Sequence, residues 1–102
     1  EVDWNGLKNV GTLVFLMGIR NRKVIAKSLI DAGKNKNTPV AFIEKATTVN
    51  QRVVCSTLEG VLKDELEVES PAVFVIGEVV AFHHDWNWFL KSYPETEVSV
   101  GL

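Results

Sequence analysis

Polar side chains gather between two apolar segments near the middle of the chain. The segment 46–52, Ala-Thr-Thr-Val-Asn-Gln-Arg, separates the apolar run 39–43 from a second apolar run at 53–55. Hydroxyl, amide and guanidinium groups at strand ends are suited to holding a ligand, because loops at strand ends carry the binding residues of α/β folds. The same composition also suits an ordinary polar hairpin, and the residues alone leave both interpretations open.

A second candidate group is basic. Residues 1–52 carry nine Lys or Arg against four Asp or Glu, and residues 53–102 carry two against nine, so the halves have net charges of +5 and −7. Such asymmetry can mark a surface for an anionic partner, although a solvated helix face is the alternative. A pI near 5.6 and the lack of a recognised motif argue against nucleic acid. The basic residues in question are Arg20, Arg22, Lys23 and Lys27.

The remaining reactive side chains have structural explanations. Cys55 is the single cysteine, so it forms no internal disulfide, and its place in a strand pattern predicts a buried, inert thiol. His83 and His84 are adjacent and point in different directions on a helix, which makes a poor metal site. There is also no Ser-His-Asp set, carboxylate pair or P-loop pattern. We therefore assign no catalytic residue and no metal ligand.

The first half of the chain predicts a strand, a helix and a second strand. Residues 12–17 are apolar and β-branched, as in a short buried strand. Residues 21–32 form an amphipathic helix that Asn21 can cap and Gly33 can stop. The apolar run 39–43 follows as the next strand. This order implies a right-handed parallel crossover.

The second half predicts a hairpin, a helix and a last strand. The short bridge within residues 39–57 favours an antiparallel pair. Ser56 and Glu59 have the spacing of a capping box, so a helix should begin there. Residues 72–82 read as the last strand, in which Gly77 indicates a bulge or the close approach of a ligand or another backbone. We expect one α/β domain, with a mixed sheet of four or five strands flanked by helices.

Size and composition agree with one domain. The chain has 102 residues, of which 46% are hydrophobic and 24% charged. No apolar run approaches the roughly 20 residues of a membrane span, and no secretory signal opens the chain. We expect a cytoplasmic protein without membrane contact. The first residue is Glu1 rather than methionine, which suits a segment of a longer protein.

Three motifs occur in order along the chain. They are TLVF-x-MG at residues 12–18, P-V-A-x-I-E-x-A-T-x-x-x-Q-R at 39–52 and SPA-x-x-x-x-GEVV at 70–80, closing near residues 88–89. In this order and spacing the chain resembles the uroporphyrinogen-III C-methyltransferases, within the tetrapyrrole methylase family, over roughly residues 3–89. Leu16 departs from the tyrosine that is common before the MG motif, so any role of that hydroxyl is lost.

The resemblance implies a domain assignment and an activity. Residues 12–91 would be the C-terminal α/β domain, residues 1–11 a linker remnant and residues 92–102 a tail. The partner would be an N-terminal domain of the same parent chain, with a glycine-rich loop, and the full-length protein would be a homodimer. The cofactor would be S-adenosylmethionine, which leaves S-adenosylhomocysteine, and the substrate uroporphyrinogen III on the way to sirohaem or cobalamin. The isolated chain is expected to be inactive.

The resemblance also suggests site residues. Met17 and Ala46 align with positions that contact the cofactor, and Val79 is expected near the same wall. Without the resemblance, Met17 would be read as a gap-filler in the core. The acidic substrate would give Arg20, Arg22 and Lys23 a binding role. The alternatives are a methylase of a later corrin precursor and a non-catalytic interaction module of the same fold.

Overall fold

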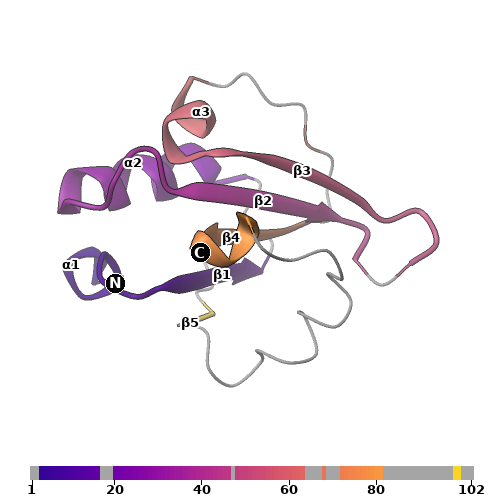
Figure 1. The fold of residues 1–102 in the computed structure, drawn as a ribbon, viewed down its shortest axis with the longest axis horizontal. Helices are drawn as coiled ribbons and strands as arrows, with labels where there is room; N and C mark the ends of the chain where they lie inside the picture. The colour runs from indigo at the N-terminus through magenta and orange to yellow at the C-terminus, as the bar shows by residue number, and fades with distance from the viewer. Residues whose placement is uncertain are drawn as a thin grey trace.

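The chain folds as a sheet with its α-helices on one face (Figure 1). The computed structural model describes residues 3–16, 20–46, 48–63, 68, 72–81 and 98–99. No helix in these ranges is long and apolar enough to span a bilayer. The elements in chain order are α1 (Trp4–Leu7), β1 (Thr12–Leu16), α2 (Arg22–Ala32), β2 (Pro39–Glu44), β3 (Arg52–Thr57), α3 (Leu58–Leu62), β4 (Ala72–Gly77), the 3₁₀ helix η1 (Glu78–Ala81) and β5 (Val98–Ser99).

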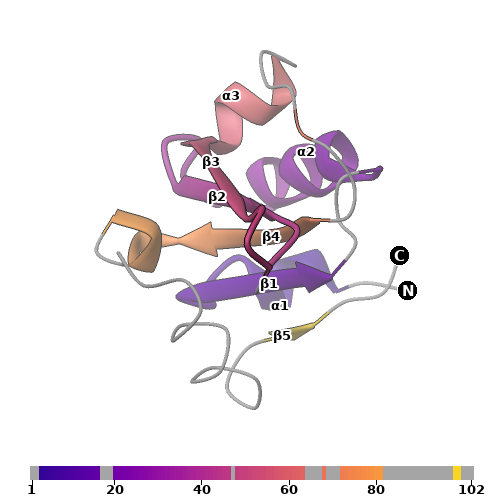
Figure 2. The same ribbon diagram turned by 90° about the vertical axis from the view of Figure 1, so that its right-hand side faces the viewer.

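The strand order is β3-β2-β4-β1-β5, which confirms the predicted mixed sheet. β4 lies between β1 and β2 and runs antiparallel to both, so β1 and β2 are parallel to each other without being neighbours. The predicted parallel relation of the two strands around α2 is therefore correct, with β4 filling the space between them (Figure 2). β5 pairs in parallel with β1 and lies within the segment 92–102 that the sequence assigns to a tail.

The predicted hairpin is confirmed as β2 and β3. The two strands pair antiparallel from Pro39 opposite Thr57 to Glu44 opposite Arg52. β3 lies at the edge of the sheet, where burial is incomplete. Cys55 is exposed on this edge strand, so the prediction of a buried thiol was wrong. Its apolar neighbours in sequence suggested burial, but a strand with a neighbour on one side only leaves part of its surface open.

One face of the sheet packs against the helices and forms the main core. Four aromatic rings cross this face from α1 to β2: Trp4 stacks on Phe15 at 6.3 Å between centroids, and Phe42 stacks on Phe74 at 4.3 Å. Phe15 and Phe74 join the two pairs at 6.1 Å, because they are paired in the register of β1 and β4. The buried residues of this core are Leu13, Phe15, Ile25, Ala26, Leu29, Val40, Phe42, Leu58, Val61, Phe74 and Ile76.

The opposite face carries a second apolar cluster and η1 (Figure 2). Its buried members are Ala41, Ile43, Val75 and Val80. Alternate residues of the central strands thus enter one cluster or the other. This explains why residues 39–43 are apolar throughout, as expected for a strand covered on both faces.

The ends of the helices agree only in part with the caps predicted from the sequence. Asn21 occupies the N-cap of α2, but its side chain makes no capping hydrogen bond. Gly33 ends α2 as predicted, with φ of +115° and hydrogen bonds from the backbone N–H groups of Gly33 and Lys34 to the last turn. The proposed capping box at Ser56 was wrong by one residue. β3 continues through Thr57, whose Oγ1 accepts from the backbone N–H of Gly60 at 3.1 Å and caps α3.

The fourth strand is shorter than the predicted range 72–82. β4 stops at Gly77, which has φ of +146°, and the chain turns there into η1. A Cβ at Gly77 would overlap the carbonyl oxygen of Gly11 and lie 3.1 Å from Cα of Thr12. The glycine therefore permits close approach of the chain's own backbone, one of the alternatives that the sequence left open. His83, His84 and residues 88–89 lie outside the described residues.

Candidate functional site

Two parallel strands end at the same edge of the sheet. In the pairing with β4, Leu16 of β1 and Ile43 of β2 both lie opposite Val73, so the carboxyl ends of β1 and β2 are level with each other. The chain that leaves β2 and the chain that leaves β1 therefore start from one end of the sheet. In open α/β sheets, ligands bind outside the carboxyl ends of parallel strands. We take this edge as the candidate site.

At this edge, polar groups of residues 45 and 48–51 hold the turn between β2 and β3. Lys45 has a left-handed backbone, with φ of +48°, and its carbonyl oxygen accepts from both N–H and Oγ1 of Thr48, at 3.1 and 2.7 Å. Oγ1 of Thr48 accepts in turn from the N–H of Asn50, and the carbonyl of Thr48 accepts from the N–H of Gln51. The hydroxyl of Thr48 thus holds the turn, which supports the interpretation of this polar segment as a structured hairpin loop.

Ala46 and Val79 share one face of the sheet but lie near opposite ends of it. Both are half-buried and pack against the second apolar cluster. Ala46 comes two residues after β2, at the candidate edge. Val79 belongs to η1, which follows Gly77, and Gly77 pairs with Thr12 at the start of β1. The structure therefore places Ala46 at the candidate edge and Val79 toward the far edge.

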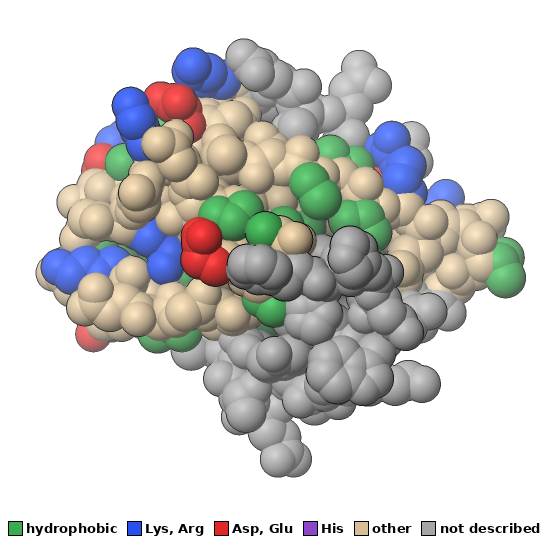
Figure 3. Space-filling model, in the orientation of Figure 1, with side chains coloured by type: hydrophobic (Ala, Val, Ile, Leu, Met, Phe, Trp, Pro, Cys, Tyr) green, Lys and Arg blue, Asp and Glu red, His purple; other side chains and the backbone are tan. Residues whose placement is uncertain are grey.

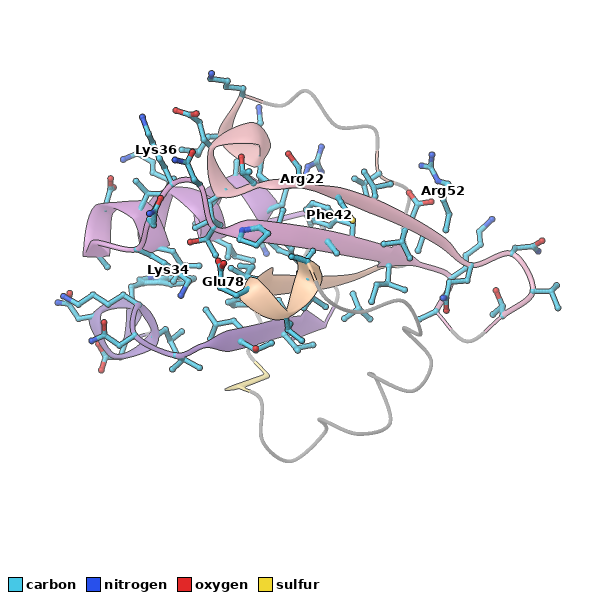
Figure 4. The ribbon with its side chains drawn as sticks, in the orientation of Figure 1. Arg22, Lys34, Lys36, Phe42, Arg52 and Glu78 are labelled. Carbon is cyan, nitrogen blue, oxygen red and sulfur yellow. The ribbon has the colours of Figure 1, made fainter. Side chains whose placement is uncertain are left out.

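The basic residues follow the carboxyl end of β1. Arg20 and Lys23 are exposed, and Arg22, the first residue of α2, is partly buried. Figure 4 shows Arg52 toward the end of the sheet at which β2 finishes, whereas Arg22 lies nearer the middle of the strands. In Figure 3, Lys and Arg side chains also gather at the right-hand end of the visible face, where the hairpin of β2 and β3 lies. Met17, which the sequence places between β1 and these residues, lies outside the described residues.

Sequence reasoning missed an ion pair at the base of the loop. Both carboxylate oxygens of Glu44 accept from Arg52, Oε1 from Nε at 2.6 Å and Oε2 from Nη2 at 2.8 Å. The Glu44 side chain is only 4% exposed, whereas that of Arg52 is 55% exposed. A signal was present in the sequence, because opposite charges stood at the two positions that close the predicted hairpin.

Lys34 makes a separate polar contact at the other end of the molecule. Its Nζ donates to the carbonyl oxygens of Lys8 and Val10, both at 3.1 Å, and so ties the start of β1 to the end of α2. Burial lowers the pKa of Lys34, and the nearby Glu78 carboxylate opposes that shift. Figure 4 shows the Lys34 and Glu78 side chains close to each other, away from the candidate edge.

The candidate edge offers surfaces for binding and alignment. Within the described ranges, no three His, Cys, Asp or Glu side chains are grouped as a metal site. What lies at the edge is an ordered loop with the small side chain of Ala46, an apolar cluster beside it and basic residues nearby. Such an arrangement can hold a ligand through backbone and apolar contacts and attract an anion.

Comparison with known proteins gives the same family from sequence and from structure. The profile of the Tetrapyrrole (Corrin/Porphyrin) Methylases matches residues 1–62. Siroheme synthase of Salmonella typhi is 42% identical over 90 residues, which cover 87% of this chain and 20% of that protein. The chain thus spans about a fifth of the length of this curated relative.

Solved structures of two methyltransferases are among those that are similar in fold. Uroporphyrin-III C-methyl transferase from Thermus thermophilus, complexed with S-adenyl homocysteine, has a TM-score of 0.74 and 38% identity, over 83% of this chain and 38% of that one. A cobalt precorrin-4 methyltransferase has a TM-score of 0.63 at 22% identity, over 74% of this chain and 33% of that one, and shows the shared fold alone. With the family profile matching more than half of its residues, this chain belongs to the tetrapyrrole methylases.

Proposed function

We propose that this chain is the second domain of an S-adenosylmethionine-dependent uroporphyrinogen-III C-methyltransferase and forms one wall of its cofactor cleft. The observation that carries the proposal is the likeness to the Thermus thermophilus enzyme complexed with S-adenyl homocysteine, at 38% identity over 83% of this chain. The preceding domain of the same parent chain would supply the opposite wall, and the full-length protein would be a cytoplasmic homodimer.

The residues at the candidate edge fit this cofactor. S-adenosylmethionine supplies a methyl group on a cationic sulfonium, so the protein mainly has to hold donor and acceptor in line. Ala46 has a small side chain on an ordered loop, which permits close approach of a ligand to the backbone. Its apolar neighbours exclude water from one side. Met17, which follows β1 in the sequence, is proposed as a second contact, and Val79 as a more remote part of the wall.

The basic residues are proposed to act on the substrate. Uroporphyrinogen III is a polycarboxylate, and exposed positive charge raises the local concentration of an anion near a cleft. Arg20 and Lys23 are exposed directly after β1, with Arg22 beside them at the start of α2. The identity of 38% to the uroporphyrin-III enzyme supports uroporphyrinogen III as the substrate.

The proposal predicts that the 102-residue chain folds by itself but does not transfer methyl groups. Its amphipathic helices and apolar strands are mutually consistent, whereas a cleft between two domains needs both. Loss of about 4 kcal/mol of cofactor contacts would weaken binding roughly a thousandfold. The test is an NMR titration of the labelled chain with S-adenosylhomocysteine, beside a turnover assay with uroporphyrinogen III.

The control is a longer protein in which a preceding cofactor-binding domain is joined to this chain. We expect turnover from the longer protein, and from the isolated chain only weak shifts near Met17 and Ala46. Methylation by the isolated chain would contradict the two-domain cleft. A longer protein that neither binds S-adenosylhomocysteine nor methylates uroporphyrinogen III would overturn the proposed function.

A further inference from the structure

The ion pair between Glu44 and Arg52 occupies an unusual position for a charged pair. Glu44 is one of the two buried polar side chains among the described residues, with 3% of the residue exposed. A buried carboxylate is costly unless its oxygens are satisfied, and two parallel N–H···O bonds from one guanidinium satisfy it with fixed geometry. The pair therefore constrains the direction in which the chain leaves β2.

The same pair closes the loop that carries Ala46. Glu44 is the last residue of β2 and Arg52 the first of β3, and they lie opposite each other in the register. Between them, Lys45 holds a left-handed backbone that a side chain rarely adopts. Such a conformation persists where neighbouring interactions hold it in place. At Lys45 these interactions are the Glu44–Arg52 ion pair on one side and the hydrogen bonds of Thr48 on the other.

We propose that Glu44 and Arg52 are positioning residues for the cofactor site. Their ion pair fixes the loop 45–51 so that the backbone at Ala46 stays in place for the cofactor. This inference rests on the proposed function, because it assigns the loop to the cofactor wall.

The experiment uses the longer protein that joins a cofactor-binding domain to this chain. The variants are Arg52→Lys, which keeps the charge but loses the bidentate geometry, Glu44→Gln, which keeps the shape but loses the charge, and the double variant. Asp31→Asn is the matched control, since it removes an ion pair with Lys27 whose side chains are 63% and 68% exposed. The measurements are affinity for S-adenosylhomocysteine, kcat and KM for S-adenosylmethionine, and hydrogen exchange of peptides covering the loop.

The expected result is a raised KM at an unchanged kcat. Arg52→Lys should raise KM and the dissociation constant by about tenfold to a hundredfold. Because the loop is proposed to bind the cofactor equally in the ground and transition states, kcat at saturating cofactor should stay near the wild-type value. The loop should exchange faster, and the control should behave as wild type. The double variant should be no worse than the more severe single variant, because residues that act as a pair are not additive.

Two results would overturn the inference. An unchanged KM together with unchanged loop exchange would show that the pair does not position the loop. A lowered kcat at unchanged KM would show that the pair serves stability alone, through the fraction of folded protein. Failure of the wild-type longer protein to bind S-adenosylhomocysteine is a different outcome, since it would remove the proposed function and this inference with it.

Discussion

Replacing Gly77 with alanine should destabilise the fold more than the same change at two other glycines. Gly77 has φ of +146°, and a Cβ there would overlap the carbonyl oxygen of Gly11. Gly33 has φ of +115°, but its Cβ would find its nearest neighbour at 3.7 Å, the Cδ of Lys8, which is an ordinary contact. A Cβ at Gly11 would have no neighbour within 4 Å. The three positions thus separate backbone strain from steric overlap.

The expected magnitudes follow from these three environments. At Gly11, alanine reduces only the freedom of the unfolded chain and should stabilise by about 0.4–1 kcal/mol. At Gly33, the left-handed backbone costs about 1–2 kcal/mol and the same entropic gain offsets part of it, for a net loss of about 1 kcal/mol. At Gly77, strain of about 1–3 kcal/mol adds to an overlap with backbone atoms of about 1–3 kcal/mol, for a net loss of about 2–5 kcal/mol.

Urea unfolding of the wild type and the three alanine variants at 25 °C measures these differences in the free energy of unfolding. Thermal unfolding gives a second measure, with a fall in Tm of roughly 4–8 °C for each kcal/mol in a domain of this size. A difference of less than about 0.5 kcal/mol between Gly77→Ala and Gly33→Ala, the usual scatter between independent sites, would contradict the predicted steric overlap at Gly77. That result would mean that the Gly11 carbonyl moves aside at no cost.

Three further predictions concern the proposed site and the pH dependence of stability. In the longer protein, Met17→Ala should weaken S-adenosylhomocysteine binding by about 1–3 kcal/mol, the cost of deleting an apolar contact; unchanged affinity by calorimetry would remove Met17 from the proposed site. Changing Arg20, Arg22 and Lys23 together to glutamine should lower kcat/KM and flatten its salt dependence at nearly constant cofactor affinity, and equal salt slopes would leave these residues as a solvated surface. Burial lowers the pKa of Lys34 in the folded state below the ordinary value of 10.5, so between the two pKa values the unfolded chain binds more protons and stability should rise with pH. Urea midpoints measured across that window should show a shallower rise for Lys34→Met, and equal slopes would contradict the argument.

The sequence was informative where local pattern and burial agree. Residues 39–43 are apolar throughout because β2 is covered on both faces, and the short polar segment after them leaves room only for a hairpin. Gly33 marked the end of α2 because the left-handed turn there suits glycine. These features depend on residues that are close in sequence, so the local pattern is enough to predict them.

The errors arose where the outcome depends on distant residues. Gly77 packs against Gly11 where β4 ends, and the local pattern indicated a close approach without identifying this partner or the strand end. Cys55 is exposed because β3 lies at the sheet edge, a position set by the strand order. The capping prediction chose Ser56 over Thr57 because both can cap, and the choice depends on where β3 stops.

The candidate site could be predicted only in outline. The proposed methyl transfer needs positioning more than reactive groups, so residue types such as Ala46 carry almost no signal without the family resemblance. Glu44 and Arg52 were visible as opposite charges, but the burial of the carboxylate depends on the packing of the whole sheet end. The family resemblance pointed to Ala46, and the structure shows the hydrogen bonds that hold the loop around it.

The position of β4 between β1 and β2 has a consequence for folding during synthesis. The hairpin of β2 and β3 joins near neighbours in the chain and can form as soon as it leaves the ribosome, whereas β1 must wait for β4, since Thr12 pairs with Gly77. Until then the inner edges of β1 and β2 lack their partner and are open to pairing with other chains. A segment that ends at residue 62, where the match to the family profile stops, would lack the strand that joins its two halves and should aggregate instead of folding.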